Sequence, residues 1–391
     1  MWEILRTRHV GPLLAGTLVG RLPNGMALLA ISLVLRSEGA DYSLVAAASA
    51  SFAVGVALGG PALGRLIDLI GQTRILIPSG ALSAVGFITI AINPSHPAFA
   101  LSGAALAGLA MPPLEPALRA LWPDLTPRRL DAAYALDSGS QQLIFVAAPL
   151  IVAGCVEYLG PVSVLWACAI FCTVGTAIVA SRPPSRRWRA PPRAANWLGP
   201  LRVPSLLAIL ATTATLGYSF GALNIAVVAV AEDPQTTVSA GVLLAINGLG
   251  ALLGALVYGA RSWESSVATR AAACLAGCAV SYAVLTVSMS IPALVYVSLG
   301  LAGAFFAPTL AALFTMITHF APTGTVTEAF AWVVTLFTVG IALGSGTAGL
   351  LAPQGPAAPL GLAAGTLLLG TATILLGRPR RPGHRERRVP T

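Results

Sequence analysis

Long apolar stretches alternate with short polar breaks along almost the whole chain. Crossing the hydrocarbon core of a bilayer takes about 20 mainly apolar residues. Twelve stretches qualify, at about residues 10–35, 43–64, 75–93, 98–122, 131–156, 161–181, 204–230, 238–260, 269–290, 292–318, 327–351 and 357–377. Most breaks carry turn formers, as in "NPSHP" at 93–97. The pattern predicts an all-α membrane protein with twelve transmembrane helices.

Composition supports a membrane location. Of the 391 residues, 56% are hydrophobic and 9% are charged, and the mean hydropathy is +0.82. Soluble proteins carry roughly 25% charged residues, so this chain has too few to cover a soluble core. The net charge of +9 would ordinarily suggest nucleic acid as a partner. Because the arginines follow membrane topology instead, we expect a lipid bilayer and no nucleic acid.

The arginine positions predict which side each loop faces. With the N-terminus inside, one side receives Arg6, Arg8, Arg65, Arg74, Arg128, Arg129, Arg182, Arg186, Arg187, Arg189, Arg193, Arg202, Arg261, Arg270 and the tail from Arg378 to Arg388. Only Arg36 falls on the other side. Basic residues concentrate in cytoplasmic loops, so both termini are expected in the cytoplasm. The absence of lysine suggests a GC-rich bacterium, and hence its cytoplasmic membrane.

A Pro- and Arg-rich segment, "SRPPSRRWRAPPRAANWLGPLRVP" at 181–204, separates the first six stretches from the last six. The predicted organisation is an N-terminal six-helix bundle at 1–181, a cytoplasmic basic linker at 182–203, a C-terminal six-helix bundle at 204–377 and a basic cytoplasmic tail at 378–391.

Internal repeats relate the two halves. Gly55, Gly59 and Gly64 recur as Gly250, Gly254 and Gly259, each 195 positions later. "GLAMPPLEPALRAL" at 108–121 matches "GLAGAFFAPTLAAL" at 300–313, and "AYA" at 133–135 recurs as "AFA" at 329–331. A nearly constant offset indicates duplicated units. The sequence therefore predicts two pseudo-symmetric six-helix bundles.

The polar stretch "GRLIDLIGQTR" at 64–74 resembles the signature loop between helices two and three of the major facilitator superfamily. That pattern has a Gly, three residues, an acid, usually a base, a second Gly and further bases. Gly64, Asp68, Gly71 and Arg74 fit it, whereas Leu69 and Gln72 stand where bases are usual. The resemblance implies the major facilitator fold and a secondary transporter.

The resemblance also implies a cytoplasmic gate. Asp68 would meet the positive N-terminus of helix eleven, where Thr325 and Glu328 have the spacing of a capping box. Gly64 would permit close helix approach and Gly71 a tight reversal. Alternatively, Asp68 only neutralises Arg65 or Arg74 at the lipid surface. In the second half Trp263 stands at the place of the acid, so only the first-half latch is expected.

Ionisable residues at membrane depth are costly and therefore face a cavity or pair with each other. Arg21 lies in helix one, Glu115 and Arg119 in helix four, and Asp137 in helix five. The resemblance places helices one and four at the central cavity. We expect these residues along a substrate or proton pathway, together with the polar candidates Asn24, Gln141 and Asn224. The alternative is structural, because Glu115 and Arg119 are spaced for an intrahelical pair.

Prolines interrupt two predicted helices at matching places. Pro112, Pro113 and Pro116 lie in helix four, and Pro308 lies in helix ten. Proline removes a backbone hydrogen bond, and paired helix breaks in the two halves indicate a transporter's binding site. The five cysteines are dispersed in apolar runs without nearby histidines. We expect no metal and no cofactor.

Function is narrowed further by a second resemblance. "ALRALWPDL" (117–125), "AAYALDSGSQQLIFVAAPL" (132–150) and "TVTEAFAW" (325–332) look like bacterial efflux members of the superfamily. This implies export of a small molecule by alternating access, and we expect coupling to proton antiport and a monomer. Glu115 or Asp137 is the expected proton carrier, because both acids lie at membrane depth. The alternatives are an uptake symporter for a polar metabolite anchored by Arg21, and a transport-dead sensor. A membrane-embedded enzyme is disfavoured, since the histidines are dispersed and no nucleophile motif occurs.

The topology is testable with reporters fused after Arg193 and after Arg388. Both should read cytoplasmic, because the arginine bias requires it. A periplasmic signal from either fusion would contradict the twelve-helix topology.

Overall fold

The computed structural model describes residues 4, 6–192, 199–231, 240–288, 291–351 and 355–376. This part of the chain contains 12 helices long and apolar enough to cross a membrane, and no strand is assigned in it. Many leucine, valine and isoleucine side chains are exposed on the outside of the helices, as lipid contact requires. The predicted all-α, twelve-span fold is confirmed.

The first six spans comprise α2 (Val10–Ser37), α3 (Tyr42–Ile70), α4 (Gln72–Ile92), α5 and α6 (Pro97–Leu109 and Leu114–Leu125), α7 (Leu130–Leu159) and α8 (Ser163–Ser181). The second six are α10 (Pro204–Ala231), α11 (Ala240–Ala260), α12 (Val267–Val287), α13 (Pro292–Phe320), α14 (Val326–Leu351) and α15 (Ala357–Leu376). Between them lie α9 (Pro183–Arg187) and the short η1 (Gly199–Arg202). Arg193 and the predicted tail at 378–391 lie outside the described residues.

The duplicated glycines make equivalent contacts in the two halves. A Cβ added to Gly59 of α3 would overlap the carbonyl of Leu109 in α5, and one added to Gly254 of α11 would overlap that of Ala304 in α13. Gly59 and Gly254 are 195 positions apart, and so are Leu109 and Ala304. The sequence repeat thus corresponds to a repeat in packing, which confirms the pseudo-symmetry.

The signature stretch is mostly helix and not loop. Helix α3 was expected to end near residue 64 but continues to Ile70, and α4 begins at Gln72. The reversal is made at Gly71, whose φ of 98° is accessible to glycine and costly for other residues. Because one residue suffices for the turn, Gly64, Arg65 and Asp68 lie on the last turns of α3.

Only one of the two predicted proline breaks exists. Pro112 and Pro113 lie in the gap between α5 and α6, while Pro116 lies in the first turn of α6, where a helix tolerates proline. In α13 the helix runs unbroken through Pro308, so the expected break there is wrong. A single proline removes one hydrogen bond, whereas the adjacent pair in helix four also forces the residue before each proline out of helical conformation.

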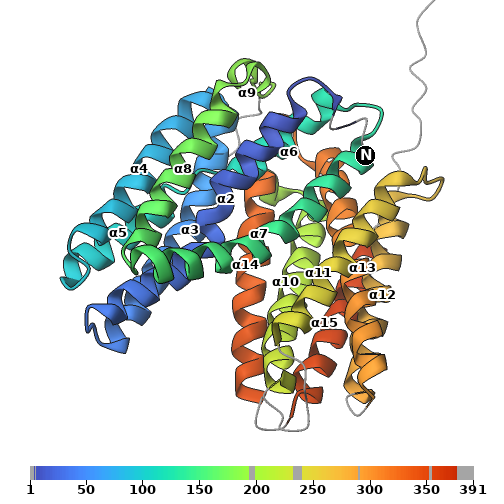
Figure 1. Cartoon of the computed structure of the whole chain (residues 1–391). Helices are drawn as coiled ribbons and strands as arrows, with labels where there is room; N and C mark the ends of the chain where they lie inside the picture. The colour runs from blue at the N-terminus through green and yellow to red at the C-terminus, as the bar shows by residue number, and fades with distance from the viewer. Residues whose placement is uncertain are drawn as a thin grey trace, which may run out of the picture.

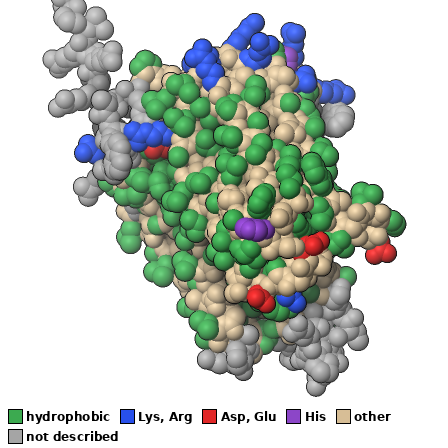
Figure 2. Space-filling model, turned by 90° about the vertical axis from the view of Figure 1, so that its left-hand side faces the viewer, with side chains coloured by type: hydrophobic (Ala, Val, Ile, Leu, Met, Phe, Trp, Pro, Cys, Tyr) green, Lys and Arg blue, Asp and Glu red, His purple; other side chains and the backbone are tan. Residues whose placement is uncertain are grey.

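The two halves meet at one end of the molecule and diverge at the other (Figure 1). Between the halves, α3 packs against α14, and α7 packs against α11 and α13. The junction lies toward the end that carries α9, where arginine side chains gather (Figure 2). The opposite ends of α2–α5 and of α10–α15 spread apart (Figure 1).

Candidate functional site

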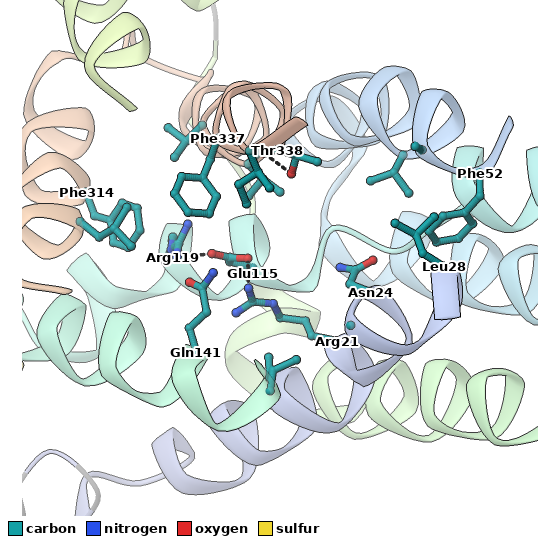
Figure 3. A pocket seen from close by; sticks show the side chains of 18 residues that line it. Arg21, Asn24, Leu28, Phe52, Glu115, Arg119, Gln141, Phe314, Phe337 and Thr338 are labelled. Atoms are coloured by element: carbon teal, nitrogen blue, oxygen red, sulfur yellow. Dashed lines mark hydrogen bonds and ion pairs between the residues drawn. The ribbon is translucent and has the colours of Figure 1, made fainter. Parts of the chain in front are cut away.

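A cavity of about 280 Å³ lies between the two halves. Its polar lining from the first half consists of Arg21, Asn24, Glu115, Arg119 and Gln141, whereas the second half contributes apolar side chains and Thr338. Figure 3 shows Glu115 between the two arginines, with Gln141 beside them and Phe314 and Phe337 across the cavity. The cavity is therefore apolar over most of its wall and charged at one place.

Exposure shows which way the cavity opens. At its base Arg21, Glu115 and Arg119 are buried, with exposed fractions of 7%, 6% and 1%. Toward the other end of α2, Leu28 is 47% exposed, and Asn24 is exposed as well. The charged base thus lies toward the arginine-rich end of the molecule, and the mouth faces the opposite end.

Four buried charges form a continuous chain at this base. Glu115 bonds Arg21 Nη2 through Oε2 and Arg119 Nη2 through Oε1. Arg119 Nε in turn lies 2.7 Å from Asp137 Oδ2. Two cations and two anions balance, which satisfies the requirement that charges at membrane depth be paired.

The helix break determines where Glu115 points. Because α6 starts again at Leu114 after the prolines, Glu115 lies in its first turn. The free N–H groups there carry partial positive charge and stabilise a carboxylate. The break also forms a side pocket of about 40 Å³, lined by Pro112, Pro113, Pro116 and Glu115 among others. Three of the predicted prolines therefore line a pocket beside the acid, whereas Pro308 does not.

Arg119 lies on the seam between the halves. Its guanidinium is 3.5 Å from the ring centroid of Phe314, and Phe330 is 5.8 Å away. Both aromatic residues belong to the second half, and a cation over a ring face is attracted by the ring quadrupole. Tyr134 of α7 donates its hydroxyl to the Arg119 carbonyl and contacts both rings. The repeat of "AYA" at 133–135 as "AFA" at 329–331 contains Tyr134 and Phe330, but no feature of the sequence pattern marked Phe314 or the contact with Arg119 in advance.

Two predicted pathway residues do not line the cavity. Asp137 is 1% exposed and lies behind Arg119, in contact with it. Asn224 is not in the cavity wall, and its amide donates to the Phe220 carbonyl one turn earlier in α10. Asn24 and Gln141 do line the cavity, and the Gln141 carbonyl oxygen has no hydrogen-bond partner within the described part of the chain.

Asp68 contacts helix α14 directly. Its Oδ1 accepts the backbone N–H of Thr327 at 3.1 Å, and its Oδ2 accepts that of Glu328 at 2.8 Å. These are the orphan donors of a helix start, which a carboxylate satisfies well. Arg74 of the same motif is exposed.

The expected capping box is replaced by this contact. The Glu328 N–H would bond Thr325 in such a box but donates to Asp68, and the Thr325 hydroxyl donates to the Pro322 carbonyl. Gly64 makes the approach of α3 to α14 possible, because a Cβ there would lie 2.9 Å from that of Ala331. The cap of α14 is thus supplied by the other half of the molecule.

A second charged contact joins the halves near the same end. Asp131, in the first turn of α7, lies 2.7 Å from Arg270 of α12 and accepts the Thr315 hydroxyl of α13 at 2.8 Å. Arg270 also donates to the Tyr258 hydroxyl. The sequence reading missed this contact, since it sought an acid at the place of Trp263. The repeat offset was the available signal, because it pairs the start of α7 with the start of α14.

Comparisons with known proteins agree with this architecture. The family model described as Major Facilitator Superfamily matches residues 13–261, and no curated protein matches. The human organic anion transporter MFSD10 (TETRAN) is similar in structure, with a TM-score of 0.70 and 16% identity over 93% of this chain and 98% of that one.

Structures of a bacterial homologue of the iron transporter ferroportin are also similar. The outward-facing state with soaked iron has a TM-score of 0.76 and 14% identity, over 95% of this chain and 100% of that one. A further outward-facing structure has a TM-score of 0.72 and 14% identity, over 95% and 99%. At these identities the likeness shows the fold. The family model, which covers more than half of the sequence, shows that the chain belongs to the major facilitator superfamily.

Proposed function

We propose that this protein is a secondary active transporter that moves a small molecule by alternating access and couples it to protons. The main support is the cavity between the two halves, which is open at one end and closed at the other by contacts between the halves. Family membership points to transport and not to enzymatic catalysis. Such a cavity must open at its closed end for the cycle to proceed.

The arginine-rich end is assigned to the cytoplasm by the positive-inside rule. On this assignment both termini are cytoplasmic and the cavity mouth faces outward. The contacts of Asp68 and Asp131 then form the cytoplasmic gate, and breaking them gives the inward-open state. Arg65 and Arg74 lie at that surface, where they contribute to orientation.

Proton coupling is assigned to the charge chain, with Glu115 as the proton-binding acid. An acid in this role must be reached by water from the cavity and must exchange its partner when protonated. Glu115 lines the cavity, whereas Asp137 lies behind Arg119. Protonation of Glu115 would remove its negative charge and release Arg21, whereas Arg119 would keep its ion pair with Asp137.

Export by proton antiport is the first candidate function and rests on the resemblance to bacterial exporters. Uptake by proton symport is the second candidate. It is favoured by Arg21, whose charge faces the cavity.

Replacing Asp68 by Asn should weaken the cytoplasmic gate. The variant keeps one acceptor and loses the charge, and hydrogen bonds to charged groups are worth about 1.5–3 kcal/mol. We expect normal insertion, reduced transport and roughly tenfold faster labelling of a reporter cysteine at buried Ala135, in a background without the natural cysteines. Arg74→Gln is the matched control, since Arg74 is exposed in the same motif. Equal labelling of both variants would reduce Asp68 to a surface neutraliser.

Asp131→Asn should open the same gate by a smaller amount. The Asp131 side chain is 33% exposed, and solvent screening leaves such pairs worth about 1 kcal/mol or less. The same reporter should label about two- to fivefold faster, and Asp124→Asn, at the exposed end of α6, should leave the rate unchanged. A larger effect than that of Asp68→Asn would reverse the proposed order of the two contacts.

Glu115→Gln tests the coupling. In proteoliposomes a panel of labelled amphipathic acids, amines and neutral compounds is followed with and without an imposed proton gradient. We expect gradient-driven accumulation to fall at least tenfold while downhill exchange survives, and Asp137→Asn to cause a milder loss. Accumulation of an outside compound under an inward gradient indicates symport, and expulsion of a loaded compound indicates antiport. If the pair is structural, protein yield falls and the pH dependence of surviving transport is unchanged; absence of any flux favours the sensor.

A further inference from the structure

The hydrogen-bonding capacity left over at the cavity base is unequal. Both carboxylate oxygens of Glu115 are occupied by arginines. Arg21 uses Nη2 for its ion pair, and its Nε and Nη1 have no hydrogen-bond partner within the part of the chain described. A guanidinium has five N–H donors and no acceptor. A ligand that reaches the base therefore meets unfilled donors of a cation, whereas each carboxylate oxygen of Glu115 already has an arginine partner.

Gln141 adds a neutral group at the same place. Its carbonyl oxygen is buried without a partner, and its side chain points toward Arg21 and Glu115 (Figure 3). An amide can present its NH₂ or its oxygen after rotation. It therefore suits a head group that also needs one neutral hydrogen bond.

The rest of the cavity is apolar. Leu28, Phe52 and Ile144 line it from the first half, and Phe337 and Ile341 from the second. Apolar surface buried against these side chains favours binding in proportion to its area. An occupant matching both parts has a single polar head and an apolar body.

We propose that the substrate is an amphipathic organic anion. This inference rests on the proposed transport function but not on the direction of transport. A carboxylate with an aliphatic or aromatic body is the simplest example. Its head group binds Arg21 in place of Glu115, with Gln141 beside it, and its body lies along the apolar wall. Planar guanidinium and carboxylate groups match in bidentate geometry, which makes arginine well suited to this role.

Charge balance then links the anion to a proton. The charged groups facing Glu115 are Arg21 from α2, Arg119 from its own helix and, through Arg119, Asp137 from α7. The neighbouring parts of α3 and α14 present Val56, Val334 and Thr335, which do not titrate. These four charged groups sum to zero, so a bound anion leaves an uncompensated negative charge. A proton on Glu115 restores neutrality and simultaneously frees Arg21.

Anion and proton therefore favour each other's binding, and this coupling is reciprocal by thermodynamic linkage. They load and leave the cavity together, as in symport, so this inference favours the second candidate function over export by antiport. A cationic substrate would behave oppositely, because its charge would disfavour protonation of Glu115 and no proton would be taken up. Proton uptake on binding thus reports an anionic substrate.

Binding is measured on the purified full-length chain with matched probes. Each set of probes shares one apolar body and differs in its head group. One set is 4-phenylbutyrate, 4-phenylbutylamine and 4-phenylbutanol, and the others are the corresponding straight-chain acids, amines and alcohols from butyl to decyl. We expect a carboxylate of the panel to bind at least tenfold more tightly than its amine and alcohol counterparts. Binding should strengthen in mildly acidic buffer, and about one proton should be taken up per anion in weakly buffered solution. If the amine binds best, if the three heads bind equally or if none binds, the assignment is overturned.

Variants locate the head group. Arg21→Gln should weaken carboxylate binding at least tenfold, as expected for loss of a charge-assisted hydrogen bond, and Arg21→Lys should restore part of it. The double variant Arg21→Gln/Glu115→Gln removes one charge of each sign, so it keeps the balance if the single variant fails to fold. It should also lose carboxylate binding. Arg36→Gln is the matched control on the same helix, since Arg36 bonds the Ala40 carbonyl outside the cavity.

Glu115→Gln imitates the protonated acid and should bind the carboxylate with no pH dependence and no proton uptake. Pronounced pH dependence in this variant would contradict the assignment of the proton. Failure of the substrate class is distinguishable from failure of the transport function. If reporter-cysteine labelling shows that both ends open in turn but no carboxylate is preferred, only the class is wrong. A carboxylate that binds without flux leaves the class intact and refutes transport.

Discussion

The structure depends on one shared carboxylate. Glu115 forms ion pairs with Arg21 from α2 and with Arg119 from its own helix, and Arg119 also pairs with Asp137 of α7. Unpaired charges at this depth are expensive, so these three spans cannot rearrange independently. The interruption of helix four is part of the same constraint, because it places the acid at a helix start that stabilises negative charge.

The charge chain is also connected to the seam between the halves. Arg119 belongs to the first half, but the rings over its guanidinium come from α13 and α14. Separation of the halves at this end would remove those rings and admit water beside the cation. Occupancy of the cavity and closure of the seam therefore act on the same side chain. On the proposed function, binding at Glu115 and Arg21 would bias the conformational equilibrium by this route.

Much of this architecture could be predicted from sequence, for definable reasons. Apolar length determines the spans, and the glycine repeat determines the pseudo-symmetry, since both depend on local composition and regular spacing. The ion-pair partners of Arg21 could not be predicted, because they depend on how α2 packs against a helix that begins at residue 114. The predicted break at Pro308 of α13 was wrong, because the presence of a proline does not by itself decide whether the residues around it remain helical. Asp131 was missed since its partners Arg270 and Thr315 lie more than a hundred residues away.

The two halves share a fold but divide the chemistry unequally. The first half supplies the charged residues of the cavity wall and both acids that join the seam, Asp68 and Asp131. The groups of the second half that contact these residues are backbone N–H groups, a hydroxyl, one arginine and aromatic rings. Substitutions in α2 and α6 should consequently alter what is bound, whereas those in α13 and α14 should alter how readily the cavity closes around it. Duplication supplied two similar scaffolds, and on the proposed function the residues that distinguish them place the charged head-group site in one half, while the gate needs an acid from the first half and its partner from the second.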